Sequence, residues 1–265
     1  MVQLAVAGAA GRMGMRIIAL AAKDPRFDIV AALETGGEPR IGQDAGELAG
    51  LGRMHLPLQN HTETAFDVLI DFTRPDGSMH WLEYCLTYGR AIVIGTTGHS
   101  ADQLRRIDAA AGTIPVLKAS NMSVAMNLMF GLVGRIAATL GDDYDIEIVE
   151  THHRFKVDAP SGTALSLCDS IVEATGRSGE ADVIYGRHGD AGQRPSRQIG
   201  MHALRVGDTV GEHEVHFGTL GETLVVRHTA HTRDTFVQGA LRAAAWLAGK
   251  PPGRYDMHDV LGMKK

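Results

Sequence analysis

The residues best suited to chemistry lie in one short segment, residues 152–156, which reads His-His-Arg-Phe-Lys. The run Pro160-Ser161-Gly162-Thr163 comes shortly after it and can cap a helix that continues through an apolar stretch. Cationic side chains and the backbone N–H groups of a helix N-terminus both attract carboxylate or phosphate. The segment therefore predicts a binding site for an anionic substrate.

Two groups in this segment are candidates for proton transfer. Imidazole titrates near neutral pH, and a lysine ammonium donates a proton when desolvation or neighbouring charge makes it more acidic. Spacing alone does not decide between His152 and Lys156. The structural alternative is a pair of histidines at a strand end beside a solvated lysine. The presence of Lys156 together with the capped Gly162-Thr163 turn favours the functional interpretation.

Composition narrows the class of protein. The chain has 265 residues, 44% of them hydrophobic and 22% charged, which is typical of a globular protein of one or two domains. A net charge of −5 argues against a nucleic-acid binder that works by neutralising phosphates. The only cysteines, Cys85 and Cys168, sit in apolar helical patterns, which favours a reducing cytoplasm. No run approaches 18 apolar residues, so we expect neither export nor membrane insertion.

The 13 histidines raise the question of a metal site. His213 with His216, and His228 with His231, are spaced by three in expected strands. That spacing puts the members of each pair on opposite faces of a sheet. We therefore expect no bound metal.

The N-terminal part alternates apolar runs with helical patterns, which predicts a Rossmann-like α/β fold with a parallel sheet covered on both faces. Ser100 and Gln103 form a capping box at the start of one helix. The expected strands are Gln3–Ala7, Asp28–Leu33, Phe66–Phe72, Ala91–Ile94 and Val116–Leu117.

Beyond Asn121 the pattern changes to a central α+β domain with a mixed or antiparallel sheet. A final helix, Thr235–Leu247, is expected to pack back on the first domain. The remaining expected elements are a long apolar helix from Ser123 to Leu140, a strand Asp145–Thr151, a helix ending at Ala174, a polar loop Gly176–Ser196, and strands Gln198–Val206, Gly211–Phe217 and Glu222–Thr229.

A glycine-rich turn after the first strand predicts dinucleotide binding. Residues 8–14 read G-x-x-G-x-x-G and open the first helix, where the glycines admit a pyrophosphate. Glu34 stands at the end of the second strand, where a carboxylate accepts hydrogen bonds from ribose hydroxyls. Its charge would repel a 2′-phosphate and Thr35 is neutral, so NADH is favoured over NADPH. The nearby Arg12, Arg16 and Arg40 leave use of both cofactors open.

Six motifs carry a resemblance to a known family. The chain resembles the 4-hydroxy-tetrahydrodipicolinate (dihydrodipicolinate) reductase family over nearly its whole length. The motifs are AGAAGRMG at 7–14, DFT at 71–73, IGTTG at 94–98, SNMSV at 120–124, HHRFKVDAPSGTA at 152–164 and VGEHEV at 210–215.

The resemblance implies a dinucleotide-binding domain of residues 1–123 completed by 234–265, and a domain of residues 124–233 that binds substrate and assembles a homotetramer. It also implies reduction of a cyclic dicarboxylate by NADH or NADPH in lysine biosynthesis through diaminopimelate. His152 would be the catalytic acid or base and Lys156 the proton donor, and His153, Gly162 and Thr163 would hold a substrate carboxylate. The residues implied to bind the cofactor are Gly8, Ala9, Ala10, Gly11, Arg12, Met13, Glu34, Gly95, Thr96, Thr97, Ala119, Ser120, Asn121 and Met122.

The sequence departs from some family members at two of these places. Thr35 replaces a basic residue seen in members that use NADPH well, and Met122 stands where an aromatic residue is frequent. Cofactor preference and packing around the nicotinamide are the properties that these departures affect.

Two other functions compete with this interpretation. Another Rossmann amino-acid dehydrogenase, acting on aspartate or diaminopimelate, would share the first domain but has no evident need for residues 152–163. A non-catalytic NADH-binding sensor would not need the cation of Lys156.

Overall fold

The structure, a computed structural model, describes residues 1–264. The chain divides into two compact units, which are described separately. The first unit joins Met1–Val124 to Asp234–Lys265, and the second comprises Ala125–Arg233.

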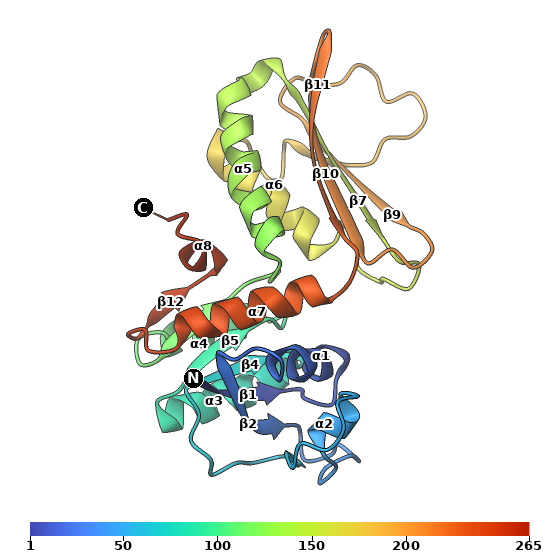
Figure 1. Ribbon diagram of the computed structural model, residues 1–265. Coiled ribbons are helices and arrows are strands. Elements are labelled where there is room, and N and C mark those ends of the chain that lie inside the picture. The colour runs from blue at the N-terminus through green and yellow to red at the C-terminus, as the bar shows by residue number, and fades with distance from the viewer. Residues whose placement is uncertain (265) are drawn as a thin grey trace. The chain divides into compact units, whose positions relative to one another are not determined.

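The first unit is built on a seven-stranded parallel sheet with the order β12-β6-β5-β4-β1-β2-β3 (Figure 1). Every residue of β4 and β5 is buried, as expected for central strands covered by helices on both faces. This confirms the predicted Rossmann-like fold. The strands are β1 Val2–Ala7, β2 Phe27–Leu33, β3 Leu58–Gln59, β4 Val68–Asp71, β5 Ala91–Ile94, β6 Pro115–Lys118 and β12 Gly253–Tyr255. The helices are α1 Arg12–Ala21, α2 Ala45–Leu48, α3 Pro75–Tyr88, α4 Ala101–Ala110, α7 Asp234–Leu247 and α8 Met257–Val260.

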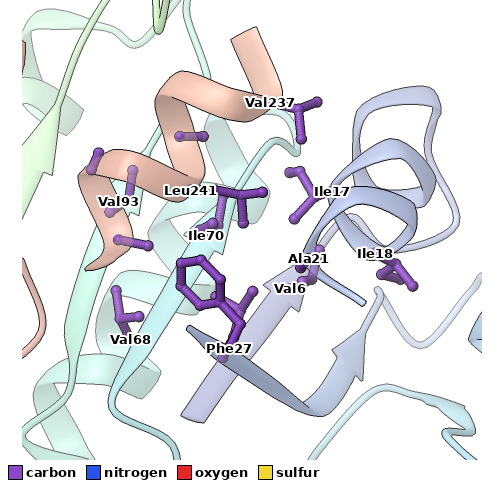
Figure 2. Close-up of a cluster of buried hydrophobic side chains, with 14 of the residues drawn as sticks. Val6, Ile17, Ile18, Ala21, Phe27, Val68, Ile70, Val93, Val237 and Leu241 are labelled. Carbon is purple, nitrogen blue, oxygen red and sulfur yellow. The ribbon is translucent and has the colours of Figure 1, made fainter. Parts of the chain in front are cut away.

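Helix α7, which follows the second unit in the chain, completes one face of this sheet. Val237 and Leu241 are buried against Ile17 of α1 and against strand residues such as Ile70 and Val93 (Figure 2). The predicted return of this helix to the N-terminal domain is thus observed. The opposite face is covered by α3 and α4, and its buried residues include Trp81, Leu82, Ile92 and Ile107.

Two local features fix helix positions. The predicted capping box is confirmed, because Ser100 accepts from the N–H of Gln103 while the Gln103 side chain accepts from the N–H of Ser100. Gly239 lets α7 approach the segment after β6, since a Cβ at this position would lie 1.7 Å from the carbonyl oxygen of Met122.

The second unit contains a mixed five-stranded sheet with the order β11-β10-β7-β9-β8. Strand β7 pairs antiparallel with β10 and parallel with β9, and α5 and α6 pack on one face of the sheet (Figure 1). The elements are α5 Val124–Leu140, a 3-10 turn Gly141–Asp143, β7 Asp145–His152, α6 Gly162–Thr175, β8 Val183–Tyr185, β9 Ile199–Arg205, β10 Gly211–Thr219 and β11 Glu222–Ala230.

The segment Val124–Asp143, which contains α5, is long and apolar enough to cross a membrane. This differs from the expectation that no segment of the chain has that length and composition. However, Met126, Phe130 and Val133 of this helix are buried in the core of the second unit. We therefore interpret α5 as a core helix.

The short elements differ most from the sequence-based expectations. Strand β8 lies inside the segment that was expected to be a loop from Gly176 to Ser196. Elements this short carry too few positions to show a period, and unlike the apolar four-residue strands β4 and β5 they have no continuous buried run that marks them in the sequence. The other short elements that were not expected from the sequence are α2, β3, β12 and α8.

The contribution of α7 to the first unit can be tested with Leu241→Ala. The side chain is 3% exposed, so we expect the free energy of unfolding to fall by about 2–5 kcal/mol, measured by urea denaturation. Leu104→Ala is the control, because Leu104 lies on α4 and is 37% exposed. Equal losses from the two substitutions would contradict the assigned role of α7.

Candidate active site

The glycine-rich turn of the first unit brings the backbone close to the carboxyl edge of the sheet. Gly8 has a positive φ of 73°, and a Cβ there would lie 2.9 Å from the carbonyl oxygen of Phe72. A Cβ at Gly14 would lie 2.1 Å from the carbonyl oxygen of Gly8, so this glycine allows α1 to pack on the turn. Gly11 caps α1 without a side-chain hydrogen bond, which leaves the N–H groups of the first helical turn oriented toward a possible anion.

Glu34 links this turn to β2. One carboxylate oxygen accepts from the N–H of Ala10 at 3.1 Å, and the other accepts from the N–H of Thr35 at 3.2 Å. Arg40 donates to the carbonyl oxygen of Ala10 at 3.1 Å and pairs with Glu38 at 2.5 Å. A carboxylate and a guanidinium therefore both lie beside the turn.

A buried carboxyl group connects the loops after β4 and β5. Asp71 accepts from the hydroxyls of Thr73 at 2.6 Å, Thr96 at 2.9 Å and Ser78. Burial raises the pKa of Asp71, although the hydrogen bonds from Ser78, Thr73 and Thr96 act in the opposite direction. The side chain of Thr96, which was expected to bind cofactor, is thus engaged inside the protein.

A cavity of about 640 Å³ lies at this edge of the sheet. Among the residues expected to bind cofactor, Gly8, Gly11, Arg12, Met13 and Glu34 line it. The sequence interpretation named Thr35 and Arg40 only for their effect on cofactor choice and missed the rest of the lining, although the DFT motif at a strand end was a signal for it. The other lining residues are Thr35, Glu38, Arg40, Phe72, Thr73, Arg74, Asp76 and Gly77.

The other residues expected at the cofactor site are not among those that line this cavity. Ala9 and Ala10 are buried beneath the turn, and the N–H of Ala9 donates to Leu33. Gly95 lies directly after β5, and a Cβ there would lie 2.4 Å from the ring of Phe72. Thr97 is exposed in the same loop, whereas Ala119, Ser120, Asn121 and Met122 lie just beyond β6.

The first unit fits a dinucleotide on two grounds. Gly8 and Gly14 have no side chain, and a Cβ at either position would collide with neighbouring backbone atoms. The space beside the turn therefore stays open for a ligand. Strand β1 lies between β4 and β2, so the chain reverses its strand order at the cavity, where open α/β sheets bind their ligands.

The second unit gathers ionisable groups on the inner face of its sheet. Burial along β7 alternates, so Glu150 and His152 point to the same side as Ile146 and Ile148. His213 of β10 lies opposite Glu150, and its ring meets that of His152 at a centroid distance of 5.2 Å.

Glu150 is fully buried but surrounded by donors. Burial by itself disfavours its charge, yet hydrogen bonds from His152, Arg205 and the N–H of Ser161 prevail and lower its pKa to about 2. Glu150 is therefore a permanent anion at neutral pH. Neither Glu150 nor Arg205 was among the expected site residues.

His213 differs from His152 in its surroundings. Burial, together with the smaller electrostatic effect of the neighbouring His152, lowers the pKa of His213 to about 3, so this ring is neutral at neutral pH. Its Nε2 lies 3.2 Å from the hydroxyl of Ser161, which also accepts from the N–H of Ala164 and so caps α6.

The loop between β7 and α6 carries the other expected residues. Lys156 forms an ion pair with Asp158 at 2.8 Å. Nδ1 of His153 is buried without a hydrogen-bond partner in the described part of the chain. Gly162, which is exposed, and Thr163 form the first turn of α6. One short segment of the second unit thus holds all five residues expected to act on substrate.

The histidines considered for a metal show a different arrangement. His213 faces the core and His216 lies on the other face of β10, as expected from their spacing. His231 lies beyond the end of β11, so the expected strand placement holds only for His228. Within residues 1–264, no group of three potential ligands is found.

Comparisons with known protein families find a match for each of the two units. Residues 2–122 match the family described as "Dihydrodipicolinate reductase, N-terminus", and residues 125–261 match "Dihydrodipicolinate reductase, C-terminus". The chain belongs to the dihydrodipicolinate reductase family. The resemblance inferred from the six sequence motifs is therefore confirmed.

Relatives of similar length support this membership. The chain is 48% identical to a 4-hydroxy-tetrahydrodipicolinate reductase of Alkalilimnicola ehrlichii over 264 residues, which cover 98% of this chain and 99% of the relative. It is 46% identical to the enzyme of the same name from Hahella chejuensis, with both chains covered in full. These relatives favour neither of the competing functions.

A solved structure shares the fold. The dipicolinate-bound dihydrodipicolinate reductase of Paenisporosarcina sp. TG-14 superposes with a TM-score of 0.75 at 24% identity, and 97% of each chain is covered. Both units of this reductase thus have the topology found in that member of the family.

The buried groups of this reductase predict how its stability depends on pH. Unfolded Glu150 and His213 titrate near 4.5 and 6.5, but their folded pKa values are about 2 and about 3. Between each pair of values the unfolded chain binds a proton that the folded chain does not. Stability is therefore lost as the pH falls from 6.5 toward 2, with a slope of up to about 1.4 kcal/mol per pH unit for each group.

His213→Gln should flatten this dependence between pH 6.5 and 4.5, measured by urea unfolding at several pH values. His188→Gln is the control, because His188 is exposed on a loop of the same unit. A slope that is the same in all three proteins would contradict the assignment to His213.

Proposed function

We propose that this protein catalyses the NAD(P)H-dependent reduction of 4-hydroxy-tetrahydrodipicolinate to tetrahydrodipicolinate in lysine biosynthesis through diaminopimelate. The observation that carries the proposal is the segment from His152 to Thr163, which places imidazoles, an ammonium and a helix N-terminus in one loop. A ring with two carboxylates needs such a combination of cations and backbone donors.

The residues of the second unit have separate tasks in this reaction. His153 and the first turn of α6, with Gly162 and Thr163, hold a substrate carboxylate. The cofactor, when bound, would supply the hydride that reduces a ring carbon of the substrate. Lys156 donates the proton that neutralises the negative charge appearing on the conjugated system, and His152 acts as an acid or base beside it. The hydroxyl group of the substrate and a hydrogen of the neighbouring ring carbon are lost together as water before this transfer, which creates the conjugated system that takes up one hydride and one proton.

The ion pair of Lys156 with Asp158 supports this assignment in one respect. It holds the ammonium in the loop at 2.8 Å from a carboxylate oxygen, while the lysine side chain retains 21% exposure. A substrate carboxylate that enters the loop can compete with Asp158 for the same cation. Binding of substrate would then reorient Lys156 toward the ring.

For the cofactor, we propose that NADH is favoured and NADPH is also used. Glu34 is fixed beside the glycine turn by the N–H groups of Ala10 and Thr35, where it can accept from ribose hydroxyls. The same carboxylate repels a 2′-phosphate. Arg40, which lines the same cavity, provides a positive charge that limits this discrimination.

We further propose a cytoplasmic homotetramer assembled through the second unit. Helices α5 and α6 pack on one face of its sheet, and Leu204 and Val225 on β9 and β11 remain exposed in this chain. Contact between sheets of neighbouring copies would cover these side chains. A monomeric mass in sedimentation equilibrium would contradict this proposal.

The proposed activity is tested by the loss of reduced-cofactor absorbance with freshly generated 4-hydroxy-tetrahydrodipicolinate. Lys156→Ala should lower kcat about 10²- to 10⁴-fold, since this is the usual contribution of a positioned general acid. Lys156→Arg keeps the positive charge but cannot release a proton at neutral pH, so it should restore substrate binding more than turnover.

Lys23→Ala is the matched control, because Lys23 is exposed in the turn after α1. Near-normal turnover by Lys156→Ala would refute the role of Lys156. Absence of any substrate-dependent oxidation in the unaltered protein would refute the reaction itself.

Cofactor choice is tested with Glu34→Gln, which keeps an acceptor oxygen but removes the charge. We expect the ratio of kcat/KM for NADPH to kcat/KM for NADH to rise roughly tenfold, equivalent to about 1.4 kcal/mol of relieved repulsion. Asp24→Asn, which alters a carboxylate in the turn before β2, should leave the ratio unchanged. A constant ratio in Glu34→Gln would exclude Glu34 as the source of the preference.

A further inference from the structure

The carboxylate of Glu150 makes four contacts, two on each oxygen. One oxygen lies 2.5 Å from Nδ1 of His152 and accepts from Arg205 at 2.9 Å. The other accepts from Arg205 at 2.8 Å and from the N–H of Ser161 at 3.0 Å. Strand β7, strand β9 and the N-terminus of α6 thus converge on one side chain that is 0% exposed.

Stability alone does not account for a charge at this position. Burying an ion pair costs desolvation energy, and apolar residues of similar size are often equally or more stabilising. Ile146 and Ile148 occupy the two preceding inward positions of β7, so an apolar side chain would continue the pattern. The carboxylate therefore requires another explanation.

The contact with Glu150 selects one form of the His152 ring. A nitrogen held against a carboxylate carries a proton, so neutral His152 has its proton on Nδ1 and its lone pair on Nε2. The surroundings of Nε2 are kept open by Gly211, because a Cβ there would lie 3.1 Å from this atom. Nε2 is thus the nitrogen available to exchange a proton.

The same carboxylate also holds the loop that carries Lys156. His152 at the start of the loop and Ser161 at its end are both bonded to Glu150. Arg205 reaches the loop as well, since it donates to the backbone carbonyl of Asp158 while it binds Glu150. The Glu150 carboxylate therefore helps to position both candidate proton-transfer groups, His152 and Lys156.

We infer that Glu150, held by Arg205, is a positioning residue that fixes the Nδ1–H tautomer of His152 and the conformation of the loop bearing Lys156. Its effect on turnover rests on the proposed function. Its effect on the tautomer does not, because the tautomer is a property of the protein without substrate.

The test is Glu150→Gln, which preserves shape but places an amide where a carboxylate oxygen faces His152. The amide N–H donates to Nδ1, so neutral His152 should shift its proton to Nε2. We expect kcat to fall about 10²-fold, the lower end of the range for acid–base catalysis, while KM for the substrate changes less than about threefold. Two-bond proton–nitrogen correlation spectra report the tautomer, with His152 assigned by its loss in His152→Asn.

Glu147→Gln is the matched control. Glu147 lies on the same strand with its side chain on the opposite face, and it also accepts from two arginines and a histidine, Arg187, Arg194 and His202. It should keep turnover within about twofold of the unaltered protein and leave the His152 signals unchanged.

Arg205→Lys gives a second route to the same answer if Glu150→Gln does not fold. It keeps the positive charge but loses the two-pronged contact and the bond to Asp158, so kcat should fall about tenfold with the tautomer preserved.

An unchanged tautomer in Glu150→Gln, or an equal loss of turnover in Glu147→Gln, would overturn the inference. A protein without reductase activity in any form would refute the proposed function, while the spectra would still decide the role of Glu150.

Discussion

The second unit depends on the neutralisation of one buried carboxylate. Glu150 cannot remain charged inside the sheet unless Arg205, His152 and the N–H of Ser161 all reach it. Removing one partner of a buried ion pair typically costs about 3–5 kcal/mol, so partial assembly of this network is strongly disfavoured. The pairing of β7 with β9 and the start of α6 are therefore coupled to the chemistry of the loop between them.

The first unit satisfies a different constraint, the close approach of backbone to backbone. Side chains at Gly8, Gly14 or Gly239 would each collide with a carbonyl oxygen at less than 3.0 Å. Its buried acid, Asp71, is held mainly by hydroxyl groups rather than by a cation. The turn and loops of the first unit are thus shaped by small residues and neutral donors, whereas the buried cluster of the second unit is organised by charge.

Elements with a clear local pattern could be predicted from the sequence. The start of α4 and the return of α7 were found because the first has a capping box and the second a helical period, and strand β5 was found because it is a continuous apolar run. Arg205 could not be found, because it lies 55 residues from Glu150 and meets it only through the parallel pairing of β7 with β9. Glu150 itself left a signal, a charged residue at an inward position of an apolar strand.

The first unit is built from two separate parts of the chain, and this affects the order in which the protein folds during synthesis. Helix α7 covers one face of the parallel sheet, yet its residues leave the ribosome after the whole second unit has been made. Domains generally fold as units during translation, with N-terminal ones first. Here the order is altered, because the nascent chain can complete the second unit while the earlier sheet still exposes Val6, Ile70 and Val93. During that interval these apolar side chains have no cover from α7, so the face of the sheet that α7 will bury stays open to contact with other polypeptides.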